Sequence, residues 1–165
     1  MWGQIIIAVL AVIAVCFAFV LINGAPYLPT LRKQIDAAFD LAELMPNDMV
    51  IELGCGDGRV LIAAAKLGYK AVGYELNPIL FIICWLRTWR WRRKKMIKVI
   101  LGDFWRHDWP HASAVYVFLL PRLMERLEKK IREQYPRGIK VISFAFQFPG
   151  LKPERQKDGV DLYNF

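Results

Sequence analysis

A glycine-rich turn between a predicted strand and a predicted helix is the part of this sequence with the clearest chemical meaning. Residues 50–59 read VIELGCGDGR, and a second apolar segment, residues 71–74, is followed by Glu75. Glycines let a backbone approach a ligand closely, and a helix N-terminus attracts negative or polar groups. An acidic side chain at the end of the next strand can accept hydrogen bonds from both hydroxyls of a ribose. The pattern therefore predicts a site for a nucleoside-containing cofactor at the carboxyl ends of parallel strands.

The spacing of the glycines distinguishes between cofactors. A dinucleotide fingerprint needs glycines at its first, third and sixth positions. Here the glycines are Gly54, Gly56 and Gly58, and the sixth position is Arg59. Asp57 would also put a negative charge where a pyrophosphate sits. The letters E-L-G-C-G-D-G instead resemble the first motif of class I S-adenosylmethionine-dependent methyltransferases, whose cofactor has a sulfonium, an amino group and no phosphate. A turn without a ligand would need the glycines but not Asp57 and Glu75.

The resemblance implies a role for each of these residues. The glycine turn with Asp57 is expected to hold the methionine portion, Glu52 to brace the turn, and Glu75 to bind the ribose. An acidic residue after the third strand of such enzymes accepts a hydrogen bond from the adenine amino group; here it is Asp103, and Phe104 can stack on the base. A helix or turn cap is the alternative role for Asp103. The expected cofactor-binding residues are Glu52, Gly54, Gly56, Asp57, Glu75, Asp103 and Phe104.

Alternating strand and helix patterns indicate an α/β fold that would align these residues. Strands are predicted at residues 49–53, 70–75, 97–101, 114–120, 140–148 and 160–165, with one short extended segment before the last. Helices are predicted at residues 31–44, 59–66, 78–92 and 122–134. The expected architecture is a Rossmann-like class I methyltransferase fold. Its sheet is mostly parallel and seven-stranded with an abbreviated C-terminal end, and one N-terminal transmembrane helix precedes it.

The transmembrane prediction depends on residues 5–22, an unbroken apolar run of eighteen residues without Pro, Gly or charge. As a helix it would span roughly 27 Å, close to the hydrocarbon thickness of a bilayer. A cleaved signal peptide is disfavoured because no Lys or Arg precedes Ile5 and no good cleavage site follows Ile22. The predicted organisation is an anchor over residues 1–23, a proline-rich linker over residues 24–30 and a methyltransferase domain over residues 31–165.

The distribution of basic residues predicts the orientation of the anchor. The first basic residues, Arg32 and Lys33, follow the apolar run. The positive-inside rule then places the domain on the cytoplasmic side, or on a mitochondrial matrix-equivalent side. The absence of an Arg-rich presequence favours a prokaryotic plasma membrane.

A basic, Trp-rich segment at residues 85–98 accounts for much of the net charge of +8. Trp and Arg prefer the headgroup zone of a membrane, so contact with the lipid bilayer is the favoured role. A solvated helix end and nucleic-acid binding are the alternatives, and nucleic acid is the least favoured. The three cysteines are scattered and the two histidines have no partners at metal-ligand spacing, so no metal site is predicted.

Four motifs together are similar to the small membrane-anchored protein-lysine methyltransferases that modify the adenine nucleotide translocase and the ATP synthase c-subunit. They are P-Y-L-P-T at residues 26–30, E-L-G-C-G-D-G-R at 52–59, G-Y-E-L-N-P at 73–78 and V-F-L-L-P at 117–121. The resemblance implies that Tyr27, Pro29 and Thr30 shape the active site and that the substrate is a lysine of a membrane-associated protein. Methylation of a lipid or small molecule, methylation of RNA, and cofactor binding without catalysis remain alternatives.

Overall fold

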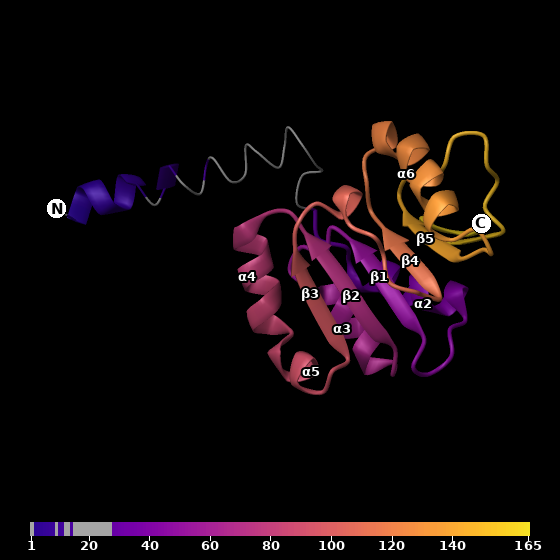
Figure 1. Cartoon of the computed structure of the whole chain (residues 1–165), viewed down its shortest axis with the longest axis horizontal. Helices are drawn as coiled ribbons and strands as arrows, with labels where there is room; N and C mark the ends of the chain where they lie inside the picture. The colour runs from indigo at the N-terminus through magenta and orange to yellow at the C-terminus, as the bar shows by residue number, and fades with distance from the viewer. Residues whose placement is uncertain (1, 9, 12–13, 15–27) are drawn as a thin grey trace.

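The computed structural model describes residues 2–8, 10–11, 14 and 28–165 and forms a sheet covered by helices on both faces (Figure 1). The strands are β1 (Met49–Leu53), β2 (Lys70–Glu75), β3 (Ile97–Leu101), β4 (Ala114–Val117), β5 (Lys140–Phe144), β6 (Arg155–Lys157) and β7 (Val160–Asn164). The helices are α2 (Arg32–Ala42), α3 (Arg59–Lys66), α4 (Pro78–Arg87), α5 (Trp89–Arg93) and α6 (Pro121–Gln134), with a short 3₁₀ helix, η1, at Phe104–Arg106.

The sheet confirms the predicted mostly parallel, seven-stranded arrangement. Its strand order is β3-β2-β1-β4-β5-β7-β6. The first five strands in this order are parallel, and β7 pairs antiparallel with both β5 and β6. The chain proceeds outward from β1 to β3 and then returns to place β4 on the other side of β1. Such a switch point opens a crevice at the carboxyl ends of the strands, where open α/β sheets bind ligands.

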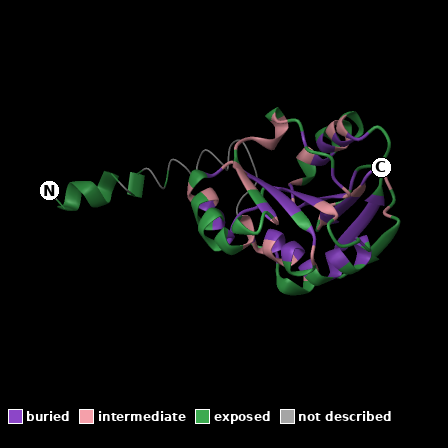
Figure 2. Ribbon diagram, turned by 60° about the horizontal axis from the view of Figure 1, so that its bottom comes forward, coloured by how far each residue is buried: buried purple, intermediate pink, exposed green. Residues whose placement is uncertain are grey.

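Two hydrophobic clusters, one on each face of the sheet, hold the layers together. The first joins α2, α3 and Cys84 of α4 to β1, β2, β4, β5 and β7. The second joins α6 and Trp109 to the opposite side chains of the same strands, such as Ile51 and Val115. The central strands are therefore buried on both faces (Figure 2), which explains why they are continuous apolar runs in the sequence.

Helix α2 is bound to the other end of the domain by ion pairs. Lys157 in β6 lies 2.7 Å from Asp40, and Arg155 lies 2.6 Å from Glu43. Helix α2 also packs against β5, β6 and β7. The first element of the domain therefore has most of its neighbours in the last strands of the chain.

Three predicted elements end at least three residues later than the corresponding elements of the structure, and the other boundaries agree within two residues. The helix predicted over residues 78–92 is divided into α4 and α5 at Thr88, whose hydroxyl donates to the Cys84 carbonyl at 2.7 Å; this type of back-bond bends helices. Strand β4 ends at Val117, ahead of Pro121, which begins α6. Strand β5 ends at Phe144, because Ala145 has a φ of 68°, outside the range of a strand.

The predicted transmembrane helix falls mainly on residues outside the described part of the chain. Residues 9, 12–13 and 15–22 of that region are not described. Within the described residues, no helix combines the length and hydropathy needed to cross a bilayer. The anchor over residues 5–22 therefore stays a prediction.

Candidate functional site

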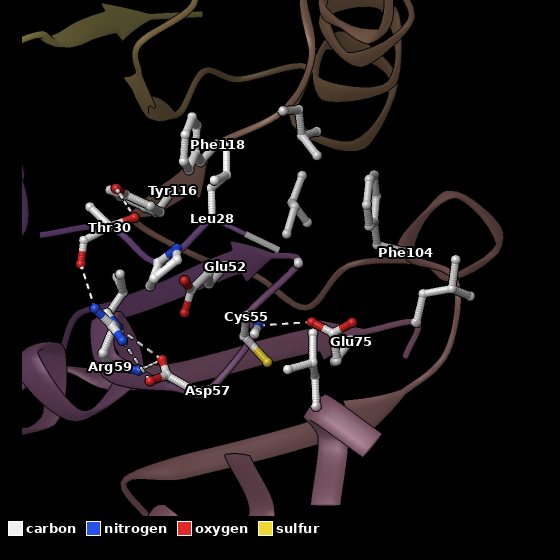
Figure 3. A pocket seen from close by; sticks show the side chains of 18 of the residues that line it. Leu28, Thr30, Glu52, Cys55, Asp57, Arg59, Glu75, Phe104, Tyr116 and Phe118 are labelled. Atoms are coloured by element: carbon white, nitrogen blue, oxygen red, sulfur yellow. Dashed lines mark hydrogen bonds and ion pairs between the residues drawn. The ribbon is translucent and has the colours of Figure 1, made fainter. Parts of the chain in front are cut away.

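One pocket at the carboxyl ends of β1, β2 and β4 brings together the described residues that the sequence indicated (Figure 3). Its lining includes Pro29, Thr30, Glu52, Gly54, Gly56, Asp57, Glu75, Asp103 and Phe104. Tyr27 lies outside the described residues. Sequence reasoning did not assign Arg59, Tyr116 or Phe118 to the site, yet all three also line this pocket. The individual roles of the lining residues remain predictions.

The glycine turn is held against the neighbouring strand by its own backbone. The backbone N–H groups of Gly54 and Cys55 both donate to the Tyr74 carbonyl, at 3.0 and 2.8 Å. Gly54 has a φ of 86°, which favours glycine, and a methyl group added there would meet no heavy atom within 4 Å. The space over Gly54 is thus open, and a ligand in the pocket can lie directly against the backbone.

Glu75 fixes the far side of the turn while keeping capacity for a ligand. Its Oε2 accepts a hydrogen bond from Gly56 N at 2.8 Å, and its Oε1 accepts one from Asn77 N at 2.8 Å. A carboxylate oxygen has two lone pairs, so each oxygen can accept one further hydrogen bond. Burial raises the pKa of Glu75, and the backbone N–H groups oppose that rise. The geometry suits acceptance of two neighbouring hydroxyls.

Glu52 is a buried carboxyl group directed into the pocket (Figure 3). It is 5% exposed, and its Oε2 has no hydrogen-bond partner among the described residues. Burial is the main cause that raises the pKa of Glu52 well above its usual value, and neighbouring acidic groups add to it, whereas a hydrogen bond from the Leu61 backbone opposes it. A cationic donor in the pocket would give the unpaired Glu52 oxygen a hydrogen bond and would stabilise the buried negative charge of the carboxylate.

Asp57 is engaged by arginines rather than free to bind a ligand. Arg59 donates to it through two nitrogens, at 3.0 and 2.9 Å, and Arg87 of α4 also forms an ion pair with it. Burial alone would raise the pKa of Asp57, but the two guanidinium groups hold it below its usual value. The carboxylate thus already interacts with two guanidinium groups, and its predicted role toward the methionine portion stays a prediction.

Arg59 also connects the glycine turn to the segment that precedes the domain. Its Nη1 donates to the Thr30 carbonyl at 3.1 Å. Thr30 is buried, and the Tyr116 hydroxyl on β4 donates to its Oγ1 at 3.4 Å. Together with Phe118, these side chains form the end of the pocket opposite Glu75 and Phe104 (Figure 3). In the sequence, the only sign of the contact between Arg59 and Thr30 was the arginine at the end of the motif over residues 52–59.

Asp103 and Phe104 lie at the end of the pocket that contains Glu75. Asp103 accepts a hydrogen bond from Trp105 N at 3.0 Å and so caps η1, while it also lines the pocket. Phe104 contacts Trp105, with ring centroids 4.7 Å apart. Asp103 therefore acts as the cap that was the alternative, and its predicted hydrogen bond to the adenine stays a prediction.

The pocket fits S-adenosylmethionine on the chemistry of its own residues. One end offers acceptors for hydroxyls and an aromatic ring, the middle has a side-chain-free turn beside the unpaired Glu52 oxygen, and the other end is lined mainly by hydrophobic and aromatic groups. The fold and this site together are those of a class I S-adenosylmethionine-dependent methyltransferase. The chain belongs to the ANTKMT methyltransferase domain family, whose model matches residues 52–155.

Individual relatives support this assignment. The chain is 35% identical over 137 residues to the ATP synthase c-subunit lysine N-methyltransferase of Rattus norvegicus, covering 82% of this chain and 63% of the relative. It is 32% identical over 131 residues to a protein-lysine N-methyltransferase of Saccharolobus islandicus, covering 78% of this chain and 81% of the relative. A crystal structure of an RNA methyltransferase from Salinibacter ruber in complex with S-adenosyl-L-homocysteine aligns with a TM-score of 0.76 and 28% identity, covering 84% of this chain and 92% of that one.

The matched region is only part of several of these relatives. The chain spans about three fifths of the length of the curated vertebrate proteins that it matches, from 55% to 63%.

Proposed function

We propose that this protein is an S-adenosylmethionine-dependent methyltransferase that methylates a lysine side chain of a membrane-associated protein. The observation that carries the proposal is the unpaired, buried Glu52 oxygen between the hydroxyl-accepting end and the apolar end of one pocket. The names of the relatives support the substrate class, since they include lysine methyltransferases of the ATP synthase c-subunit and of the adenine nucleotide translocase.

Each part of the pocket has a role in this proposal. Glu75 accepts the ribose hydroxyls, Asp103 and Phe104 contact the adenine, and the turn at Gly54 and Gly56 lies along the methionine portion. Glu52 accepts the hydrogen bond from the methionine amino group, because its Oε2 lacks a partner among the described residues. Asp57 contributes indirectly: it orients Arg59, which in turn bonds to the Thr30 carbonyl.

The apolar end of the pocket suits a lysine acceptor. S-adenosylmethionine supplies an activated methyl group, so the protein has to position a neutral amine in line with it. Neutralising a lysine with a pKa near 10.4 at pH 7.4 costs roughly 4 kcal/mol. Desolvation lowers that pKa, and Leu28, Phe118 and Leu119 provide an apolar lining for it. Tyr27, Pro29 and Thr30 are proposed to close this end around the acceptor.

The proposal includes a membrane location. Residues 5–22 form the anchor, and the domain lies on the cytoplasmic or matrix-equivalent side, with a prokaryotic plasma membrane favoured. The support is the apolar run followed by the first basic residues. Alkaline carbonate extraction of native membranes and protease protection of the domain test this placement. Release of the intact protein by carbonate would contradict it.

Radiolabelled methyl transfer tests the function. Membranes from the native host lacking this gene are incubated with labelled S-adenosylmethionine and the purified full chain, and then separated into protein, lipid and RNA fractions. We expect a discrete labelled protein, whose modified lysine mass spectrometry identifies, and loss of label with Glu75→Ala. Label confined to lipid or RNA would reject lysine methylation, and cofactor binding without label in any fraction would reject catalysis.

A further inference from the structure

Helix α4 exposes an unusual amount of apolar surface. Only Leu80 and Cys84 of this helix are buried. Ile82, Trp85 and Leu86 are 54%, 43% and 57% exposed. Positions 82 and 86 are one helical turn apart, and Trp89, the first residue of α5, is 45% exposed. The helix lies beside β3, at the edge of the sheet, and contacts β3 and β2 (Figure 1). Contiguous exposed apolar surface marks an interaction site.

Basic side chains surround these exposed apolar residues. The sequence from residue 76 to residue 102 has no Asp or Glu and contains Arg87, Arg90, Arg92, Arg93, Lys94, Lys95 and Lys98. Several lie on indole rings: the Arg92 guanidinium is 3.9 Å from the Trp85 ring centroid, and Arg90 is 5.8 Å from that of Trp89. We call the exposed residues Ile82, Ile83, Trp85, Leu86, Trp89, Arg90 and Arg93 the α4–α5 face.

We infer that the α4–α5 face docks on an anionic phospholipid bilayer. Aliphatic side chains at Ile82, Ile83 and Leu86 gain free energy by entering hydrocarbon, while Trp and Arg prefer the headgroup zone just above it. The lack of acidic residues complements anionic headgroups. Nucleic acid would use the basic and aromatic groups but offers little to an aliphatic stripe, because its binding comes from phosphate contacts and base stacking.

Docking through this face would bring the candidate site close to the bilayer. Leu76, which precedes α4, and Leu80 in its first turn line the pocket, and Arg87 at its end pairs with Asp57 of the glycine turn. The helix that touches lipid therefore also forms one wall of the site. The inference does not depend on methyl transfer, because lipid contact is measured without cofactor or substrate.

A site-specific quenching experiment tests the inference with the full chain, so the N-terminal segment is present in every sample. Leu86→Cys is labelled with a small fluorophore, and the protein is reconstituted in phosphatidylcholine vesicles that contain or lack phosphatidylglycerol and carry a spin-labelled lipid quencher. The control is Leu67→Cys, at the end of α3, because Leu67 and Leu86 are similarly exposed at 51% and 57%. The unsubstituted chain, carried through the same labelling, supplies the background from Cys16, Cys55 and Cys84.

We expect strong quenching at position 86 and weak quenching at position 67 when phosphatidylglycerol is present. Removing phosphatidylglycerol or raising the salt concentration should reduce the quenching at position 86. Equal quenching at the two positions would mean that proximity to the vesicle, not docking, is being measured, and no quenching at position 86 would mean that the face stays in water. Either result overturns the inference.

A charge-matched pair of double variants separates lipid docking from general attraction. Each basic residue near an anionic surface changes the docked-to-undocked ratio about fivefold, so Arg90→Gln with Arg93→Gln should lower it roughly 25-fold. Lys129→Gln with Arg137→Gln removes the same charge from exposed positions in and after α6 and should leave the ratio nearly unchanged. Equal effects of the two pairs would overturn the inference. So would salt-sensitive binding of an RNA probe lost only with the first pair, together with no lipid quenching.

Discussion

Replacing Glu52 with glutamine keeps the shape of the side chain and removes the charge that the site leaves unpaired. The residue is 5% exposed and its Oε2 has no partner among the described residues, so its interaction with a bound ammonium would be strong. A hydrogen bond to a charged group contributes about 1.5–3 kcal/mol, and 1.4 kcal/mol corresponds to a tenfold change in affinity. We therefore expect Glu52→Gln to weaken binding of S-adenosylhomocysteine by roughly 10- to 100-fold.

The same substitution should remove a proton linked to binding. Burial raises the pKa of Glu52 well above its ordinary value of 4.5, so the carboxyl is protonated in the ligand-free protein at a pH moderately above that value. A bound ammonium favours the charged form. At a pH between the ordinary and the raised pKa of Glu52, binding should release up to one proton from the parent protein and fewer from Glu52→Gln.

Glu52→Gln should raise the stability of the ligand-free protein, although it lowers the affinity for the ligand. Because the folded pKa of Glu52 lies above the unfolded value, the folded state binds this proton more tightly. The free energy of unfolding then falls as pH rises from the unfolded pKa through the folded pKa, by about 1.4 kcal/mol for each unit of pKa shift. Glu52→Gln lacks this loss, so above that pH range it should be more stable than the parent protein although it binds the ligand more weakly.

Calorimetry in buffers of different ionisation enthalpy gives the affinity and the proton count, and urea unfolding at several pH values gives the stability. Glu133→Gln, on the exposed surface of α6, is the matched control and should behave as the parent protein. The reasoning is refuted if Glu52→Gln binds with parental affinity, or if both proteins release the same number of protons.

Four further substitutions address the turn, the ion pairs and the apolar end. Gly54→Ala should cost only about 1 kcal/mol of stability but abolish S-adenosylhomocysteine binding. Gly58→Ala should cost about 3 kcal/mol of stability, because its methyl group would lie 2.6 Å from the Cys84 sulfur. Urea unfolding measures the loss of stability, and calorimetry measures the loss of binding. Arg87→Gln should cost about 1 kcal/mol near neutral pH, a value discounted because the arginine is 46% exposed. The difference should shrink as the pH falls below the unfolded pKa of Asp57 and vanish below the lowered folded pKa, where the carboxyl is protonated in both states. Thr30→Val should cost about 1–3 kcal/mol of stability, because the buried Tyr116 hydroxyl loses its acceptor. It should leave S-adenosylhomocysteine affinity nearly unchanged and lower the methyl-transfer rate about tenfold, because positioning of the lysine acceptor is lost; a parental rate would exclude that role for the hydroxyl.

The sequence predicted most of the sheet because its central strands are largely apolar runs, whereas β6, with the sequence RQK, was predicted only as a short extended segment. It also placed Glu75 and Asp103 at the pocket, because the carboxyl ends of parallel strands share one edge. The ion pair between Arg87 and Asp57 could not be predicted, since it depends on how α4 lies against the glycine turn. Tyr116 was missed for a related reason: in a strand that is apolar throughout, alternation does not tell which side chains face the ligand.

The helix break at Thr88 could not be predicted from the sequence for a different reason. The run of apolar and basic residues has no Gly or Pro at this point, and a single hydroxyl that bonds to its own helix divides it. The aliphatic half of the exposed face belongs to α4 and the basic, Trp-rich half to α5. Sequence reasoning emphasised the basic half, because exposure of Ile82 and Leu86 is visible only in the folded chain.

The ion pairs between α2 and β6 have a consequence for the order of events during synthesis. Helix α2 leaves the ribosome first, but its partners Arg155 and Lys157, and the β7 strand it packs against, are made last. At about 5–20 residues per second, roughly ten seconds separate the two ends of the domain. For that time α2 lacks its partners in β5, β6 and β7, although α3 is already available to it. If residues 5–22 enter a bilayer as proposed, the partly synthesised chain is anchored there, and the domain completes its folding only after its final strand has been made.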